Sequence, residues 1–436
     1  MAPKSGATKS SRADYVDSYY ARTLGDSRSR PALDGVVDVE TCVIGGGLAG
    51  LATALDLAER GRSVALLESH RVGWGASGRN GGFMSPGYAA GVEALVDKVG
   101  LQQAREMYAL SKQGHALVRE RIQTYGIDCG PVEQGGLRCA MAGRDEKLEA
   151  YCAYMAKEFD TNFDYWPAAR VRESLATSRY SDAFFNPHTY RLHPLNLARG
   201  MAAALEGKGG RIYEQSRVTG IAPRPARREV RTANGLIRAD HVVLACGGYI
   251  GWLHWPVSAA TVPVATFVMV TEPLGERLKS AIRVPYAISD IQTPTNYYRP
   301  LADGRLMWGG RVLTWQPGAD RLARDLKRDM VSFYPGLAGA RVEVAWGGLM
   351  GYHRHRLPFI GQIADGVWCA AGFGGLGLAS TTMAGRLIAA GIADRDDRWR
   401  MFTQYGLPFA AGVFGRIPAQ FVYWRDAVLG WRRRLG

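Results

Sequence analysis

The segment CVIGGGLAGLATALDLAERGRSVALLES constrains the fold more than any other part of the chain. Residues 36–44 are expected to form a buried strand, because their apolar positions become continuous towards the end. A G-x-G-x-x-G pattern of Gly45, Gly47 and Gly50 follows at once, and apolar residues then recur at helical spacing over 48–59. The stretch SVALLE reads as a second strand. The order predicts a strand, a glycine turn, a helix and a parallel strand.

Each of these positions has a physical role in a dinucleotide site. Gly45 allows the tight turn, Gly47 lets the backbone approach a pyrophosphate, and Gly50 lets the helix pack against the strand. The start of the helix offers free N–H groups and a partial positive charge to phosphates. Glu68 ends the second strand, where a carboxylate can accept hydrogen bonds from both ribose hydroxyls and disfavours a phosphorylated ribose. We therefore predict that the chain binds a dinucleotide other than NADP.

A second glycine-rich segment, RVGWGASGRNGGFMSPG, follows where a nicotinamide-binding domain would continue into another strand and helix. Backbone amides of such a segment can line an extended cofactor, and Arg79 can add positive charge. The alternative is a flexible surface loop.

Several segments together resemble the flavin-dependent amine oxidoreductases of the D-amino-acid oxidase superfamily, and most closely the γ-glutamylputrescine oxidase-like branch. They are DVETCVIGGGLAGLATAL, LLESHRVGWGASGRNGG, HPLNLARGMAAALEGKGGRIYEQSRV and RLPFIGQI. The resemblance covers roughly residues 15–430 in the same order. It implies an α/β chain, α+β overall, in which a Rossmann-like FAD-binding domain of glutathione-reductase type carries an inserted antiparallel-sheet substrate domain.

The resemblance also implies which positions contact FAD, most of them in glycine turns. The expected contacts are Gly45, Gly47, Leu48, Ala49, Gly50, Glu68, Ser69, Gly75, Ala76, Ser77, Arg79, Asn80, Gly81, Gly82, Val218, Cys246, Gly247, Trp252, Gly347, Gly372, Gly374, Gly375, Leu376 and Gly377. For Trp252, packing in the core is an equal alternative.

The last glycine turn departs from the family. Relatives commonly carry a histidine there, as G-x-x-G-H-G, whereas this chain has Leu376 between two glycines. The departure puts any histidine-dependent step at this position in doubt, and it favours FAD bound without a covalent bond. The turn is followed by a helix whose first amides can stabilise negative charge on a reduced flavin ring.

The resemblance and the strand and helix patterns suggest a discontinuous cofactor domain with two insertions. We expect the cofactor domain at 36–90, 190–255 and 341–400, and the substrate domain at 91–189 and 256–340. An N-terminal arm at 1–35 and a C-terminal helical segment at 401–436 complete the division.

Candidate catalytic residues lie in the second insertion. Tyr298, with Tyr297 beside it, suits an aromatic wall around an amine, although sheet core is an equal alternative. Arg305 could place positive charge near the flavin to assist oxygen reduction. Arg311 could line the pocket, with a solvated arginine as the alternative. No metal site is expected, since the histidines His353 and His355 lack an evident third ligand.

The expected reaction is oxidation of a C–N bond in a polyamine derivative, amino acid or secondary amine. A hydride passes to flavin N5, and the imine hydrolyses to an aldehyde or keto acid, with oxygen or another acceptor reoxidising the cofactor. Two alternatives stay open: an FAD-dependent 2-hydroxy-acid or quinone-linked dehydrogenase, and a non-catalytic electron-transfer flavoprotein.

Charge and cysteines bear on partners and location. The net charge is +14, but the arginines are scattered and no nucleic-acid-binding motif accompanies them, so no nucleic-acid partner is expected. The basic end, YWRDAVLGWRRRLG, could touch a membrane, with an amphipathic helix as the alternative. Six cysteines without a CxxC pair and a polar start favour a reduced, cytoplasmic protein. The oligomeric state stays open.

Overall fold

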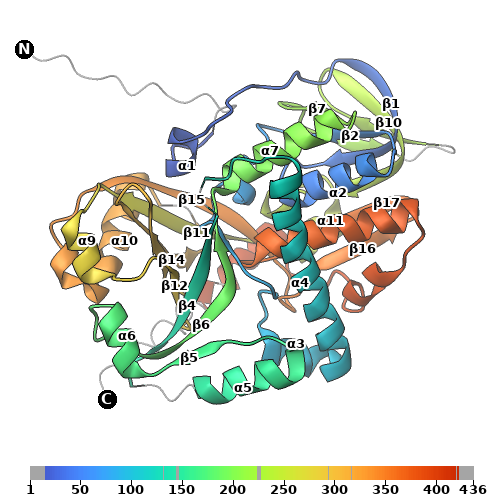
Figure 1. The fold of residues 1–436 in the computed structure, drawn as a ribbon. Helices are drawn as coiled ribbons and strands as arrows, with labels where there is room; N and C mark the ends of the chain where they lie inside the picture. Colours follow the sequence, from blue (N-terminus) through green and yellow to red (C-terminus); the bar gives the residue numbers. More distant parts are fainter. Residues whose placement is uncertain are drawn as a thin grey trace, which may run out of the picture.

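The computed structural model describes residues 15–421 apart from residues 131, 144–146, 223–226, 293, 316 and 419. The described chain forms two sheets that stand side by side, with helices around each (Figure 1). This two-sheet α/β architecture confirms the fold class expected from the sequence.

The first sheet has the strand order β16-β17-β10-β1-β2-β7, with β9 beside β10 and β8 beside β9. Its bounds are β1 Gly35–Ile44, β2 Val64–Leu67, β7 Arg211–Tyr213, β8 Gly220–Ala222, β9 Arg228–Arg231, β10 Gly235–Leu244, β16 Phe359–Ala364 and β17 Val367–Ala371. Within this sheet, the neighbouring strands β7, β2, β1, β10 and β17 run parallel to one another. All four residues of β2 are buried, as expected for a parallel strand that is covered on both faces.

Four helices form a layer on one face of this sheet: α2 Leu48–Glu59, α4 Leu101–Thr124, α7 Pro194–Gly207 and α11 Gly377–Ala393. α11 packs against both α2 and α4, and α2 packs against α7. Their apolar residues form one buried cluster with β1 and β2. Because α2 and α11 are buried on nearly every side, they contain small residues at most contact positions.

A buried carboxylate connects three of these helices. Asp56 on α2 is 0% exposed. It accepts hydrogen bonds from Arg121 of α4, from Arg60 at the end of α2 and from Arg386 of α11. Arg121 is itself only 2% exposed. The helix layer therefore contains an ion cluster whose members compensate one another in a low-dielectric setting.

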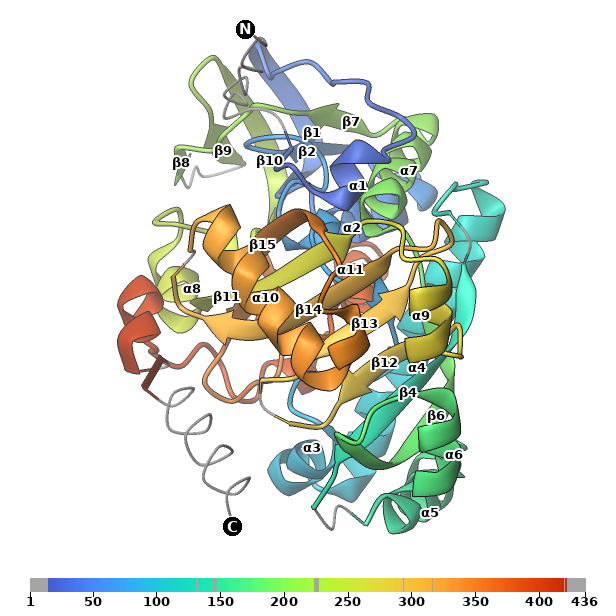
Figure 2. The same cartoon turned by 90° about the vertical axis from the view of Figure 1, so that its left-hand side faces the viewer.

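The second sheet has the order β15-β11-β14-β13-β12-β4-β6-β3, with β5 beside β6. Its bounds are β3 Phe83–Met84, β4 Glu133–Met141, β5 Asp164–Trp166, β6 Tyr180–Arg191, β11 Val262–Thr271, β12 Ala287–Asp290, β13 Tyr297–Pro300, β14 Leu306–Leu313 and β15 Val342–Tyr352. Neighbouring strands are antiparallel except β12 and β4. Helices α6 Ala168–Ser174, α9 Glu276–Ala281 and α10 Ala319–Phe333 cover its outer face (Figure 2).

The remaining helices are short. They are α1 Tyr19–Arg22, α3 Val92–Val99, α5 Leu148–Phe159 and α8 Trp255–Ala260, with 3-10 turns at Ala76–Gly78, Gly247–Tyr249, Pro335–Leu337, Arg398–Phe402 and Gly412–Gly415. All six cysteines are free thiols, and burial raises the pKa of Cys42, Cys246 and Cys369. Within the described part of the chain, no helix combines the length and the apolar character that crossing a membrane requires.

The expected domain boundaries need correction at the sheet edges. The expected range 341–400 of the cofactor domain includes β15, whose β-like sequence also suits the antiparallel sheet, and β15 pairs with β11 in that second sheet. The segment 91–189, expected in the substrate domain, supplies β4, β5 and β6 to the second sheet, while its helix α4 packs on the first sheet's helices. Residues 1–14 of the N-terminal arm and residues 422–436 of the basic end lie outside the described residues.

Replacement of Asp56 tests the buried ion cluster. Asp56→Ala leaves Arg121 buried beside only Glu59, whose Oε2 is 3.3 Å away. We expect a loss of about 3–5 kcal/mol in the free energy of unfolding, measured by urea titration. The matched control is Asp394→Ala, which removes the 55% exposed partner of Arg60 and should cost less than about 1 kcal/mol. Equal effects of the two variants would contradict the assigned role.

Candidate functional site

A single cavity of about 860 Å³ lies between the two sheets. On one side it meets the carboxyl ends of β1, β2, β10 and β17, where Ile44, Leu67, Ala245 and Ala370 line it together with the turns that follow. On the other side it meets the inner face of the second sheet. Ligands of open α/β sheets bind at the carboxyl ends of the strands, where crossovers diverge. The cavity is therefore the candidate site.

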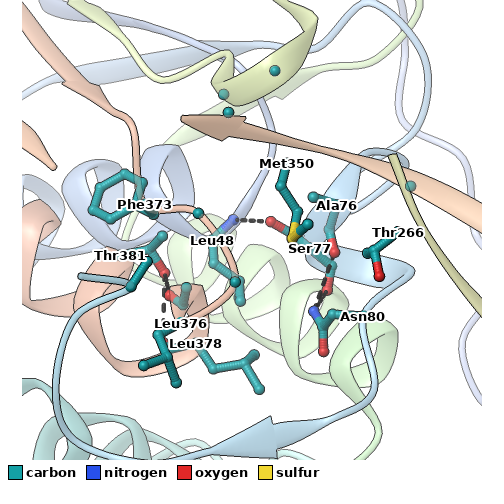
Figure 3. Close-up of a pocket in the computed structure, with 18 of the residues that line it drawn as sticks. Leu48, Ala76, Ser77, Asn80, Thr266, Met350, Phe373, Leu376, Leu378 and Thr381 are labelled. Atoms are coloured by element: carbon teal, nitrogen blue, oxygen red, sulfur yellow. Dashed lines mark hydrogen bonds between the residues drawn. The ribbon is translucent and has the colours of Figure 1, made fainter. Parts of the chain in front are cut away.

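The turn after β1 brings strand and helix into direct backbone contact. Gly45 has a φ of +111°, and a Cβ on Gly50 would lie 2.0 Å from the Gly45 carbonyl oxygen. The backbone N–H of Leu48 donates to the Ser77 hydroxyl at 2.9 Å (Figure 3). Helix α2 has no acidic residue in its first turn. Its positive end faces the cavity, and no side chain of the helix's own first turn neutralises it.

Glu68 is fixed by the backbone of the same turn. Its Oε2 accepts a hydrogen bond from the Gly46 N–H at 2.7 Å, and its Oε1 accepts one from the His70 N–H at 2.9 Å. Burial raises the pKa of Glu68, and these two backbone donors oppose that rise. The carboxylate thus stands at the carboxyl end of β2 and lines the cavity beside the glycine turn.

The second glycine-rich segment wraps the same region. Arg79 donates from Nε to the Trp74 carbonyl at 2.6 Å, and its guanidinium lies 3.9 Å from the centre of the Trp74 ring. Its Nη2 is buried and has no hydrogen-bond partner in the described chain. Burial lowers the pKa of Arg79. Asn80 donates to the carbonyls of Ala76 and Ser77, which holds the short 3-10 turn in place (Figure 3).

The last glycine turn connects β17 to α11 and lines the cavity. Gly372 and Gly374 have φ values of +80° and +58°, and a Cβ on Gly372 would lie 2.3 Å from Nδ1 of His353. Leu376 precedes α11, whose first turn carries no acidic residue. Figure 3 places Phe373, Leu376, Leu378 and Thr381 together on this side of the cavity. The positive ends of α2 and α11 therefore face one cavity.

The cavity continues away from Glu68 along the second sheet, in a part that we call the sheet-side arm. Its lining residues belong to segments 83–95, 108, 136–138, 151, 163, 184–189, 266, 287–297 and 312. Tyr297 stands at its entrance: a Cβ on Gly81 would lie 2.8 Å from the Tyr297 ring, and the Tyr297 hydroxyl is 3.3 Å from the Thr266 hydroxyl. Burial raises the pKa of Tyr297 to about 12.

The structure brings most of the expected FAD contacts to the cavity wall. These are Gly45, Gly47, Leu48, Ala49, Glu68, Ser69, Gly75, Ala76, Ser77, Arg79, Asn80, Gly81, Val218, Cys246, Gly247, Gly372, Gly374, Gly375, Leu376 and Gly377. Their contact with a cofactor stays a prediction, since their position alone is observed.

Four expected FAD contacts do not line the cavity. Gly50 and Gly82 face backbone, because a Cβ on either would meet a carbonyl oxygen at 2.0 or 2.3 Å. The carbonyl oxygen of Gly347 instead accepts a hydrogen bond from Nη1 of Arg79 at 3.4 Å. Trp252 is 66% exposed and stacks on Trp255, so it neither contacts the cavity nor fills the core.

The expectation for Tyr298 is wrong in position. Adjacent residues of a strand point to opposite faces, and Tyr297 takes the cavity face, so Tyr298 points into the outer core. There it is 0% exposed, and its hydroxyl bonds those of Tyr180 and Tyr334 at 3.2 and 2.7 Å. The sequence shows two adjacent tyrosines, but it does not show which of them faces the cavity.

Arg305 and Arg311 also lie outside the cavity wall. Arg305 pairs with Asp303 and Glu343 at 3.1 and 3.0 Å. Arg311 pairs with Asp329 and has its guanidinium 3.6 Å from Asp325 of α10. Both charges are neutralised by carboxylates of the second sheet and its outer helix. Neither arginine reaches the cavity wall, which corrects both candidate catalytic positions.

Sequence reasoning missed several wall residues that only strand register reveals. Met350 and Tyr352 of β15 line the cavity, and so does Tyr249, whose hydroxyl accepts the Leu349 N–H at 2.9 Å. Gly46 was also missed, although it binds Glu68. Among the described residues, no group of three or more His, Cys, Asp or Glu side chains could hold a metal ion.

Comparisons with known proteins agree with this geometry. A family model described as FAD dependent oxidoreductase, DAO, matches residues 40–390. Gamma-glutamylputrescine oxidoreductase of Escherichia coli strain K12 is 34% identical over 97% of this chain and 99% of its own. L-proline dehydrogenase from P. horikoshii has a TM-score of 0.70 at 19% identity, covering 85% of this chain and 96% of its own. Glycine oxidase from Bacillus cereus has a TM-score of 0.68 at 20% identity, with 85% and 100% covered.

The cavity wall fits an FAD molecule on two observations. The close packing of Gly50 on the Gly45 carbonyl brings the start of α2 to the carboxyl end of β1, so that Gly47 and Leu48 line the cavity there. The buried Nη2 of Arg79 lacks a partner in the described chain, so an anionic or carbonyl group of a ligand would satisfy it. Glu68 stands beside the same cradle as an acceptor for hydroxyl groups.

Glu68→Arg tests the ribose acceptor. The change replaces an acceptor held by Gly46 with a cation, and Gly46 leaves little space, since a Cβ there would lie 3.0 Å from the Glu68 Cβ. We expect FAD to bind at least tenfold more weakly, about 1.4 kcal/mol, in equilibrium dialysis. The control is Glu276→Arg, an 82% exposed carboxylate outside the cavity. Unchanged retention of FAD by Glu68→Arg would refute the assigned role.

Proposed function

Because the chain belongs to the DAO family of FAD-dependent oxidoreductases, we propose that it oxidises the C–N bond of a small-molecule amine. The enzyme class follows from the family, whereas the amine is the proposed part. The product would be an imine, which water hydrolyses to an aldehyde or keto acid, and oxygen or another acceptor would take the electrons.

The observation that carries the proposal is the composition of the sheet-side arm. It opens onto the glycine turns in the same cavity, and its described lining residues include no carboxylate and no imidazole. Its tyrosines do not titrate near neutral pH: burial raises the pKa of Tyr88, Tyr108 and Tyr151 as well as that of Tyr297. An amine that enters as the free base needs no protein group to remove a proton, which suits such a wall.

Bound FAD would supply the hydride acceptor for this chemistry. The chain's own residues would position and shield the reactants. Gly45, Leu48, Ser77 and Arg79 would hold the diphosphate and its surroundings, while the first amides of α11, after Leu376, would stabilise negative charge. Tyr297 and Met350 would exclude water from the reacting carbon.

The relative from Escherichia coli supports an amine with a long substituent, because its name specifies gamma-glutamylputrescine. The volume of about 860 Å³ is also near the upper end of the range for small-molecule sites, so the cavity has space for a cofactor and part of a substrate. We further propose non-covalent FAD: Cys369 in β17 is buried and Leu376 stands where relatives have histidine.

An anaerobic substrate panel tests the proposed function. The flavin absorbance of the FAD-loaded protein is followed with γ-glutamylputrescine, putrescine, glycine, proline and lactate. We expect at least one amine to bleach the flavin within seconds, with lactate inactive. Bleaching by lactate alone would favour a 2-hydroxy-acid dehydrogenase, and bleaching by none, despite bound FAD, would favour an electron-transfer flavoprotein. Admission of oxygen and a peroxide assay then separate an oxidase from a dehydrogenase.

The pH dependence tests the absence of a protein base. The rate constant for flavin reduction divided by KM should rise tenfold per pH unit up to the pKa of the free amine, because only the neutral amine reacts. Two amines of different pKa should give profiles displaced by that difference. A shared inflection near pH 7 for both amines would show that a protein group accepts the proton and would contradict the assignment.

A further inference from the structure

The sheet-side arm carries a single charged side chain among its described lining residues, Arg138 of β4. The other charged groups of the cavity wall lie on the glycine-turn side: Glu68, His70, Arg79, Arg217 and Arg356. Arg138 is exposed, and it belongs to no ion pair within the described chain. A positive charge without a carboxylate in the same arm repels a polycation and attracts an anion.

Arg138 has aromatic neighbours that shape its end of the arm. Across the strand pair it stands opposite Phe184, whose ring centre is 4.7 Å from that of Phe163 and 5.5 Å from that of Tyr151. All three rings line the cavity. Burial raises the pKa of Tyr151, exposed Glu93 adds to that rise, and Arg138 opposes it, which places the guanidinium in electrostatic reach of the Tyr151 hydroxyl. Glu93 does not line the cavity.

The strand register gives the distance from Arg138 to Tyr297, beside which the reacting carbon of the substrate would lie. Tyr297 pairs with Ser289, Ser289 pairs with Arg138, and all three line the cavity. They form one row across β13, β12 and β4. Two strand spacings separate Tyr297 from Arg138, which is about 10 Å. A group bound at Arg138 therefore lies about that far from a carbon held beside Tyr297, which is beyond the reach of an α-amino acid's own carboxylate.

From this row we propose that Arg138 is the anion subsite of the cavity and selects amines that carry a carboxylate at the far end of a chain. The subsite rests on the proposed amine oxidation. The aromatic rings beside Arg138 cover the chain that connects the two ends, and Ser289 lies between them as a hydrogen-bond donor or acceptor. Free diamines lack the anion and have a second cation instead, so they bind weakly.

The test uses two isosteric probes, N-glutarylputrescine and N-pentanoylputrescine, in which a methyl group replaces the carboxylate. Wild type should reduce its flavin with the carboxylate probe at about tenfold higher kcat/KM, and Arg138→Gln should abolish that preference through KM while kcat stays within twofold. Arg138→Lys should restore part of the preference. Glycine, which cannot reach Arg138 from Tyr297, should be turned over equally by wild type and Arg138→Gln, or equally not at all.

Two control variants separate the subsite from general charge effects. Arg324→Gln removes an exposed arginine of α10 outside the cavity and should leave the preference unchanged. Arg356→Gln removes the exposed cavity arginine beside Tyr352. Loss of the preference in Arg356→Gln, with Arg138→Gln like wild type, would overturn the proposal and move the subsite to the glycine-turn side.

A binding measurement keeps the subsite separate from the proposed function. Isothermal titration of both probes into the FAD-loaded protein without oxygen measures affinity whether or not flavin is reduced. About tenfold tighter binding of N-glutarylputrescine, lost in Arg138→Gln, supports the subsite even if no amine is oxidised, which would refute the function alone. Equal affinities of the two probes for wild type would overturn the subsite even if both are oxidised.

Discussion

The carbonyl oxygen of Gly45 lies 2.0 Å from where a Cβ on Gly50 would stand, so β1 and α2 can meet only through glycine. That contact points the positive end of α2 at the carboxyl ends of the parallel strands. The same turn presents the Gly46 N–H to Glu68 and the Leu48 N–H to Ser77. One backbone crossing thereby arranges the first amides of α2, the Glu68 carboxylate and the second glycine-rich segment around a single cavity.

The helices that pack against α2 stabilise this crossing. Asp56 of α2 bonds arginines of α2, α4 and α11, so the two helices whose N-termini face the cavity are connected through one buried carboxylate. A buried ion cluster need not increase net stability. Removal of one charged side chain, however, leaves the others buried without a partner, which lowers the free energy of unfolding. The cluster therefore connects α2 and α11, the two helices that follow the glycine turns.

The second sheet determines what else the cavity accepts. Its inner face supplies Tyr297, Ser289 and Arg138 in one row, and its outer face buries Tyr298 against Trp308. Because side chains alternate along a strand, a shift of one residue would exchange these faces and place a different set of groups against the substrate. Under the proposed function, the cofactor would be held by the turns of the first sheet and the substrate would be selected by the inner face of the second.

The sequence by itself determined the first sheet's central unit and the glycine turns, because a turn that needs positive φ or a missing Cβ can be met only by glycine at fixed spacing. The FAD-dependent family followed from the resemblance of several longer segments, which the family comparison confirms. Most residues expected at the cavity lie in such turns and reach its wall. The tertiary structure decided the rest. It paired Arg305 and Arg311 with carboxylates and placed Tyr297, not Tyr298, at the cavity. It also brought Arg138 into the arm. These outcomes depend on strand register and on partners far away in the chain, and no local pattern specifies either.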